Sequence, residues 1–243
     1  GGVMRRFIET DKFPVEKVNE RSAVEKQGGG RPPHWEMVFW WTRKPLIGAR
    51  AVIAGALLPE DISIQRFETL INLDAKVPHR LNPHIADDLK PFFEGKKLLD
   101  PFAGFGSIPL EAMRMGLDTT AVELLPTAYI FLKAVLEYPA KYGKSLAEDV
   151  ERWGNWIIEQ LKNDPDIKEL YEDDVAVYIG TWEVKCPHCG KWTPLVGNWW
   201  LARVKDNNGK YKRLAYMDYE KVRDGVEIKV VDVNREVAKN VKG

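Results

Sequence analysis

The spacing of hydrophobic residues changes along this chain and predicts a mixed α/β fold. Apolar positions recurring at helical spacing, together with proline and serine at first-turn positions, predict helices at 14–27, 45–58, 126–138 and 146–162. A proline at 139 is expected to bend or end the third of these. Residues 59–96 predict two short helices. From Val175 the period becomes two, which predicts strands at 175–184, 199–205, 211–217 and 226–233.

A glycine-containing loop lies in the middle of the chain. The short apolar strand Leu98–Leu99 runs into Asp-Pro-Phe-Ala-Gly-Phe-Gly-Ser, residues 100–107, and Ser107 is expected to cap a helix over Ile108–Met115. Glycines at 104 and 106 allow positive φ and a close approach of backbone N–H groups to a ligand. A helix that begins directly behind such a turn favours negative groups there.

An acidic residue follows the glycine loop at a spacing that is typical of nucleoside-binding sites. A second strand, Thr119–Val122, ends in Glu123, 19 residues after Gly104. A carboxylate in that position can accept hydrogen bonds from both ribose hydroxyls of a nucleoside cofactor. The alternative is an ordinary strand–turn–helix that binds no ligand, but the full octet in this context favours a cofactor site.

The octet resembles the S-adenosylmethionine (AdoMet) loop of amino-methyltransferases, which methylate exocyclic amines of nucleic-acid bases. The resemblance implies that the loop holds the methionine end of the cofactor and that Glu123 holds the ribose. The residues that it assigns to the cofactor are Asp100, Pro101, Phe102, Ala103, Gly104, Gly106, Ser107, Glu123 and Leu124. A segment just ahead of the loop commonly completes this pocket, so Asn82 is a further candidate. A helix cap is the alternative role for Asn82.

The N-terminal stretch narrows the resemblance to one subgroup. Its Trp-x-Arg-Lys-Pro-Leu…Arg-Ala…Leu-Leu-Pro pattern, with Glu-Leu-Leu-Pro-Thr-Ala from residue 123, resembles adenine-specific DNA methylases that carry an inserted zinc ribbon. The resemblance covers most of residues 5–200, although Leu125 stands where that family usually has asparagine. It implies a Rossmann-like AdoMet-dependent methyltransferase core at 59–174, incomplete here. A helical N-terminal segment at 1–58 would precede it, and a β-rich partial zinc ribbon at 175–243 would follow.

Aromatic and basic residues adjoin one another near residue 40. Trp40 and Trp41 stand next to Arg43 and Lys44, a combination that suits base stacking with phosphate neutralisation. We therefore expect these four residues to contact nucleic acid, DNA first and RNA as an alternative. Arg43 is also a candidate for the cofactor carboxylate. The competing interpretation is that the tryptophans are core residues and that Arg43 pairs with an acid.

The two cysteines form half of a zinc site. Cys186-Pro187-His188-Cys189-Gly190 has the spacing of a zinc knuckle, whose glycine lets backbone N–H groups point at thiolates. Tetrahedral zinc needs four ligands, and the chain has no second cysteine pair, so zinc would need ligands beyond this chain. A thioredoxin-like redox pair would need the cysteines at a helix start, and the flanking strands argue against it.

Charge and hydropathy limit the partners. The net charge is zero, but residues 1–58 carry +4, residues 59–184 carry −10 and residues 185–243 carry +6, counted from the sequence. Basic ends around an acidic middle suit a polyanion held by the flanks. No apolar run approaches the ~20 residues of a membrane span, so we expect no membrane association. Two cysteines exclude a disulfide scaffold, which predicts a cytoplasmic location.

The catalytic motif of amino-methyltransferases is absent from the sequence. That motif, Asp/Asn/Ser-Pro-Pro-Tyr/Phe, accepts hydrogen bonds from the target amine, whereas Pro32-Pro33 lies between Arg31 and His34. We therefore expect an enzyme that methylates N6 of adenine in DNA, here without its catalytic residues and dependent on a downstream half or a partner subunit. The alternatives are an RNA guanine-N2 methyltransferase and a non-catalytic AdoMet- or nucleic-acid-binding module that works with a separate catalytic chain.

Overall fold

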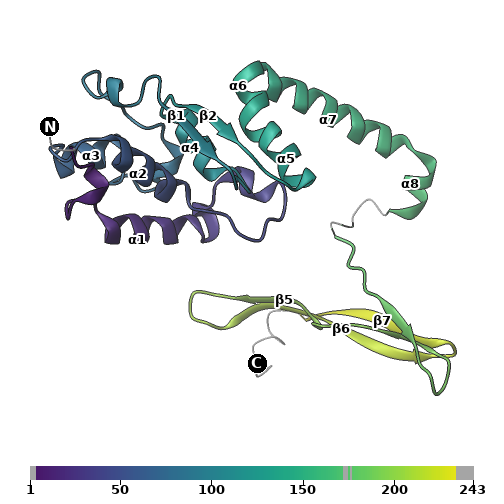
Figure 1. Ribbon diagram of the computed structural model, residues 1–243. Coiled ribbons are helices and arrows are strands. Elements are labelled where there is room, and N and C mark those ends of the chain that lie inside the picture. The colour runs from purple at the N-terminus through teal and green to yellow at the C-terminus, as the bar shows by residue number, and fades with distance from the viewer. Residues whose placement is uncertain (1–3, 172–174, 176, 234–243) are drawn as a thin grey trace. The chain divides into compact units, whose positions relative to one another are not determined.

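The computed structural model describes residues 4–171, 175 and 177–233 (Figure 1). The fold is mixed α/β, with a helical N-terminal half and small antiparallel sheets near the C-terminus. The chain divides into two compact units, residues 1–161 and 162–243. Within the described part, no helix combines the length and the apolar character needed to cross a membrane.

Helices dominate the first unit. Each predicted helix has a counterpart, and the observed elements are α1 (Val15–Glu25), α2 (Leu46–Leu57), α3 (Ile64–Leu70), α4 (Ser107–Arg114), α5 (Pro126–Leu132), α6 (Tyr138–Tyr142) and α7 (Ser145–Asn163). Single 3-10 turns lie at 7–9, 28–30, 33–36, 78–80 and 90–92. Of the two short helices predicted within 59–96, only α3 is a regular α-helix.

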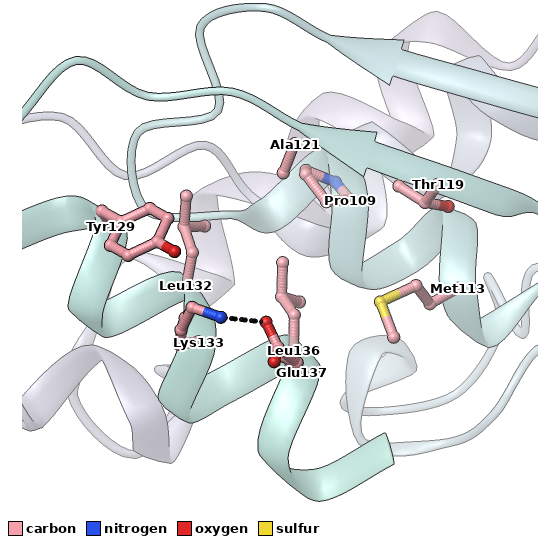
Figure 2. A pocket seen from close by; sticks show the side chains of 9 residues that line it. All are labelled: Pro109, Met113, Thr119, Ala121, Tyr129, Leu132, Lys133, Leu136 and Glu137. Carbon is pink, nitrogen blue, oxygen red and sulfur yellow. Dashed lines mark hydrogen bonds and ion pairs between the residues drawn. The ribbon is translucent and has the colours of Figure 1, made fainter. Parts of the chain in front are cut away.

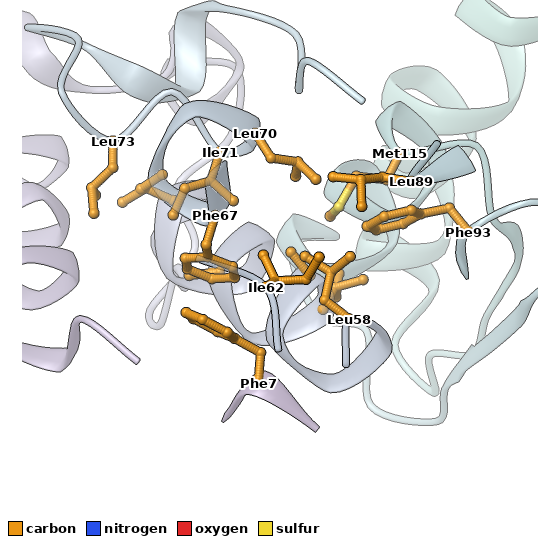
Figure 3. Packing of buried hydrophobic residues seen from close by; sticks show 14 of the residues in the cluster. Phe7, Leu58, Ile62, Phe67, Leu70, Ile71, Leu73, Leu89, Phe93 and Met115 are labelled. Carbon is orange, nitrogen blue, oxygen red and sulfur yellow. The ribbon is translucent and has the colours of Figure 1, made fainter. Parts of the chain in front are cut away.

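The main core of this unit lies around α2 and α3. Phe7 stacks on Phe67 with ring centroids 4.3 Å apart, and Phe93 and Met115 close the far side of the same cluster (Figure 3). Helix α2 is apolar on most sides, and eight of its 12 residues are buried. This core contains residues from before and after position 58. It therefore positions the glycine loop, residues 100–107, against the N-terminal helices.

Two short parallel strands carry the glycine loop. β1 (Lys97–Asp100) pairs with β2 (Asp118–Ala121) in register from Lys97 opposite Asp118 to Asp100 opposite Ala121. Helix α4 makes the crossover between them, as expected for a βαβ unit. The described residues show no Rossmann sheet, since these are the only two parallel strands in them.

One sequence prediction in this region is wrong. Ser107 does not cap α4: the N-cap is Gly106, and the Ser107 hydroxyl donates to the Lys44 carbonyl at 2.6 Å. Pro139, expected to bend or end its helix, does not end it, because helical structure continues in α6 to Tyr142. A π-helical turn, Lys133–Glu137, precedes the proline and shifts the hydrogen-bond register, so that the missing N–H is accommodated.

The second unit contains a short helix and two small sheets. Helix α8 (Pro165–Leu170) comes first, and β3 (Glu183–Lys185) then pairs antiparallel with β4 (Trp192–Pro194). Strands β5 (Trp200–Lys205), β6 (Tyr211–Val222) and β7 (Gly225–Val233) form an antiparallel sheet in that order. The three later strand predictions are confirmed, and β6 is longer than expected. The strand predicted at 175–184 is wrong over its described part, which is irregular until Glu183; residue 176 lies outside the described residues.

Candidate functional site

The glycine loop makes a tight turn from β1 into α4. Asp100 ends the strand, and its carboxylate accepts a hydrogen bond from the Phe102 N–H at 3.1 Å. Gly104 and Gly106 have φ of +51° and +79°, in the left-handed region that favours glycine. The conformation at Gly106 favours glycine, and a Cβ there would lie 2.7 Å from the Leu132 side chain, whose end would have to move.

A cavity of about 270 Å³ opens beside this loop. Residues from three segments line it: Trp40, Thr42 and Lys44 before α2; Asp100, Phe102, Ala103, Gly104, Phe105, Gly106, Ser107 and Ile108 from the loop; and Glu123 after β2. Seven of the predicted cofactor residues are therefore brought together. Pro101, Leu124 and Asn82 do not line this cavity, and neither do Trp41 and Arg43.

Glu123 connects the two loops that border the cavity. Its Oε2 accepts from the Gly104 N–H at 2.8 Å, and its Oε1 accepts from the N–H groups of Leu124 at 2.8 Å and Leu125 at 3.3 Å. These backbone donors, Leu125 first, lower the pKa of Glu123, so the carboxylate is charged at neutral pH. Because a carboxylate offers about four acceptor sites, one remains for a ligand hydroxyl, and the longer Leu125 bond is the easiest to exchange.

An aromatic stack supports the loop from behind. Phe105 stacks on Phe131 at 3.8 Å between centroids, and Trp40 and His34 lie 6.2 Å from the same ring. The Arg43 guanidinium lies over the rings of Trp35 and Phe105, at 5.3 and 6.0 Å, and donates to the Trp35 carbonyl at 2.7 Å. Arg43 is thus half-buried and already bonded to the protein, while Trp40 forms part of the cavity wall.

Large apolar side chains project into solvent from the segments around the cavity. Trp41 is 89% exposed, Phe102 87% and Leu124 91%, and Phe39 makes an edge contact with Trp41 at 6.4 Å. Exposed aromatic side chains of this size commonly mark interaction surfaces. Of the residues predicted to contact nucleic acid, Trp41 and Lys44 are exposed, whereas Trp40 and Arg43 are partly buried.

A second cavity, of about 300 Å³, lies against β2 (Figure 2). Helix α4 borders it on one side, and α5 with the π-helical turn Lys133–Glu137 borders it on the other. Its walls are mainly apolar, with Leu132, Leu136 and Met113 pointing inward. The one ion pair drawn there joins Lys133 to Glu137 at 2.6 Å. None of the sequence-predicted site residues lines this cavity, so we do not place the cofactor in it.

A buried ion pair holds α2 and α4 together, and the sequence analysis did not predict it. Arg50 is fully buried, and its Nε donates to the Glu111 carboxylate at 2.6 Å. Its other N–H groups donate to three carbonyls, of Ile71 and Pro78 at 3.1 Å and of Leu81 at 2.8 Å. A lone arginine within an apolar helix was the available signal, because a charge that is buried must be paired.

Two more polar residues, Glu25 and Asn82, hold neighbouring segments of the first unit in place. Glu25, at the end of α1, accepts from the N–H groups of Leu46 and Ile47 at 2.7 and 2.8 Å and so caps α2. Asn82 is exposed, and its side-chain oxygen accepts from Arg114 Nε at 3.2 Å. Asn82 begins no helix, so the alternative role as a helix cap is wrong, and its hydrogen bonds stabilise the segment ahead of β1.

The cysteine motif adopts a knuckle at the turn from β3 to β4. The Gly190 N–H donates to the Cys186 carbonyl at 2.8 Å, with Gly190 at φ +71°. The N–H groups of Cys189 and His188, together with the Cys189 thiol, lower the pKa of Cys186. Within the described ranges, no group of three or more His, Cys, Asp or Glu side chains is placed to hold a metal. A tetrahedral zinc at this knuckle would need two ligands besides the two thiols.

Comparison with known proteins identifies one partial match. Residues 12–77 match a family described as a protein of unknown function (DUF1156). No curated protein and no solved structure matches the chain. The matched residues span α1 to α3 and include Trp40, Thr42 and Lys44 of the cavity wall, but they end before the glycine loop.

Proposed function

We propose that this chain binds AdoMet in the cavity beside the glycine loop. It would be the cofactor-binding portion of a longer methyltransferase that acts on a nucleic-acid base, N6 of adenine in DNA. One observation carries the proposal: a loop with two left-handed glycines opens onto a cavity that also contains the charged Glu123, which follows the neighbouring parallel strand. AdoMet combines a nucleoside with a charged amino-acid end, so it needs both features.

The donor set fits the two ends of this cofactor. Ser107 and Ile108, at the N-terminus of α4, line the cavity, and the helix N-terminus there would favour the methionine carboxylate. Asp100 would accept from the methionine ammonium. Glu123 keeps an acceptor site for a ribose hydroxyl, while Trp40 supplies an apolar wall.

When bound, AdoMet supplies an electrophilic methyl group: a nitrogen–methyl bond forms as the sulfur–methyl bond breaks, and the amine releases a proton. This chain would orient the cofactor, and the exposed Trp41 and Phe102 would contact the base. No Asp/Asn/Ser-Pro-Pro-Tyr/Phe segment is present to accept hydrogen bonds from the target amine. That group would come from a downstream segment or a partner subunit.

Isothermal titration calorimetry with AdoMet and with S-adenosylhomocysteine tests cofactor binding. Both should bind the wild-type chain, and Glu123→Ala should weaken both by about 10- to 150-fold, since a hydrogen bond to a charged group is worth ~1.5–3 kcal/mol. Glu137→Ala is the matched control, because it removes an equivalent carboxylate from the second cavity. Thermal melts of each variant check that the fold is kept.

Two results would refute the assignment. One is the absence of AdoMet binding by the wild-type chain, and the other is unchanged affinity in Glu123→Ala. A tritiated-methyl assay addresses the chemistry separately: DNA or RNA should acquire no label from this chain alone. Robust turnover would instead mean that the 243 residues contain their own catalytic motif.

A further inference from the structure

Strands β5 and β6 of the second unit carry a chain of alternating aromatic and cationic side chains. Tyr216 meets Trp200 edge-on at 5.9 Å, and the Arg203 guanidinium lies 5.3 Å from the Trp200 ring centroid. Arg203 Nη2 also donates to the Tyr211 hydroxyl at 3.1 Å, and Lys205 Nζ lies 5.0 Å from the Tyr211 ring centroid. We call these five residues the β5–β6 ladder.

Two irregularities in strand pairing create the ladder. In a regular strand Trp200 and Arg203 would point to opposite faces, because successive side chains alternate. The β5–β6 register shifts between Trp200 and Ala202, and again between Val204 and Lys205. These shifts bring Trp200, Arg203 and Tyr211 together on one face. Bulges that re-aim side chains in this way are over-represented beside functional sites.

The cations of the ladder differ from others in the same sheet. Arg213 pairs with Asp232 and Lys229 pairs with Glu220, whereas no carboxylate among the described residues pairs with Arg203 or Lys205. Both ladder cations are accessible, and Trp200 is 38% exposed. The ladder is therefore a surface that offers unpaired positive charge next to aromatic rings.

We propose that the β5–β6 ladder binds single-stranded nucleic acid. Bases stack on aromatic rings and on guanidinium planes whatever their sequence, and the cations neutralise phosphates. An acidic polypeptide would match the cations but not the rings. This inference does not rest on the proposed function, since it requires no cofactor.

Fluorescence anisotropy with a labelled 20-nucleotide oligothymidylate tests the proposal on the whole chain without cofactor. Trp200→Ala should weaken binding by about 5- to 150-fold, and Trp200→Phe should restore most of the affinity. The double variant Arg203→Gln/Lys205→Gln should reduce the slope of log affinity against log salt by about 1.4, or ~0.7 for each phosphate that is no longer neutralised.

The control variant is Lys221→Gln/Arg223→Gln, which makes the same charge change near the β6–β7 turn and should keep the wild-type slope. Far-ultraviolet circular dichroism confirms that each variant retains its sheet. Glu123→Ala should bind the oligonucleotide as the wild type does, which separates this surface from the cofactor site.

Several results would overturn the proposal. Absence of binding at tens of micromolar chain is one, and equal slopes in the two double variants is another. Equal affinity for a duplex of the same length would exclude base stacking. Competition by polyglutamate as effective as that by the oligonucleotide would make the ladder a surface for acidic polypeptides.

Discussion

Replacing Arg50 with methionine should destabilise the first unit severely. Methionine preserves much of the apolar stem but removes four hydrogen bonds, one to the Glu111 carboxylate and three to backbone carbonyls. Breaking a buried ion pair costs about 3–5 kcal/mol, because the remaining charge is left unpaired in the interior. Arg114 still pairs with Glu111 at 2.6 Å, which partly compensates that charge. Each of the three carbonyl hydrogen bonds is worth about 1 kcal/mol.

Together these contributions predict a loss of about 6 kcal/mol in the free energy of unfolding, the lower end of their sum because Arg114 partly compensates the Glu111 charge. That is a large part of the ~5–15 kcal/mol typical of a domain, and it corresponds to a fall in Tm of about 12–24 °C. Urea denaturation followed by tryptophan fluorescence measures the loss. The matched control is Arg66→Met, which breaks the exposed pair with Asp88 and should shift the midpoint far less.

A double-mutant cycle with Glu111→Gln then isolates the pair. The double variant should lose less than the sum of the two single variants, because removing Arg50 no longer leaves a charged carboxylate behind. A loss for Arg50→Met no larger than that for Arg66→Met would refute the reasoning. It would mean that the segment containing residues 71–81 is held by packing alone.

Two further predictions concern titration and metal content. Burial, followed by the charges of His79 and Arg114, lowers the pKa of His34 to about 4, while Glu25 opposes the shift. The unfolded chain therefore binds this proton more readily, so the free energy of unfolding should fall as the pH drops from 6.5 towards 4. His34→Gln should flatten that dependence, which urea midpoints measured at pH 7 and at pH 4.5 would show. An unchanged pH dependence in His34→Gln would contradict this. For zinc, metal analysis should find well under one equivalent per chain, reduced further in Cys186→Ser, because only two thiols are in place. One tightly held zinc per monomer would disprove the half-site.

The sequence predicted features that depend on near neighbours. Gly104, Gly106 and Glu123 could be placed because a strand–turn–helix motif positions them locally, and the structure brings all three to one cavity. Trp40, which the sequence analysis predicted to contact nucleic acid, also lines that cavity. Thr42 was missed because nothing in its immediate sequence relates it to a loop some 60 residues later.

Features set by distant partners could not be predicted. The sequence does not show that Arg50 would meet carbonyls at 71, 78 and 81, or that Glu25 would cap a helix that begins 21 residues later. Ser107 has the residue type of an N-cap, but Gly106 takes that position because its φ is +79°. The Ser107 hydroxyl donates instead to the Lys44 carbonyl, so in each of these cases the partner lies far away in the sequence.

The position of Glu123 affects how fast a ligand can be captured. Its carboxylate cross-links the amide of Gly104 to those of Leu124 and Leu125, so the two loops around the cavity form a single rim before any ligand arrives. A preorganised rim saves the entropy of loop ordering, and association need not wait for closure. Differences in affinity among ligands of this cavity should therefore lie mainly in their residence times.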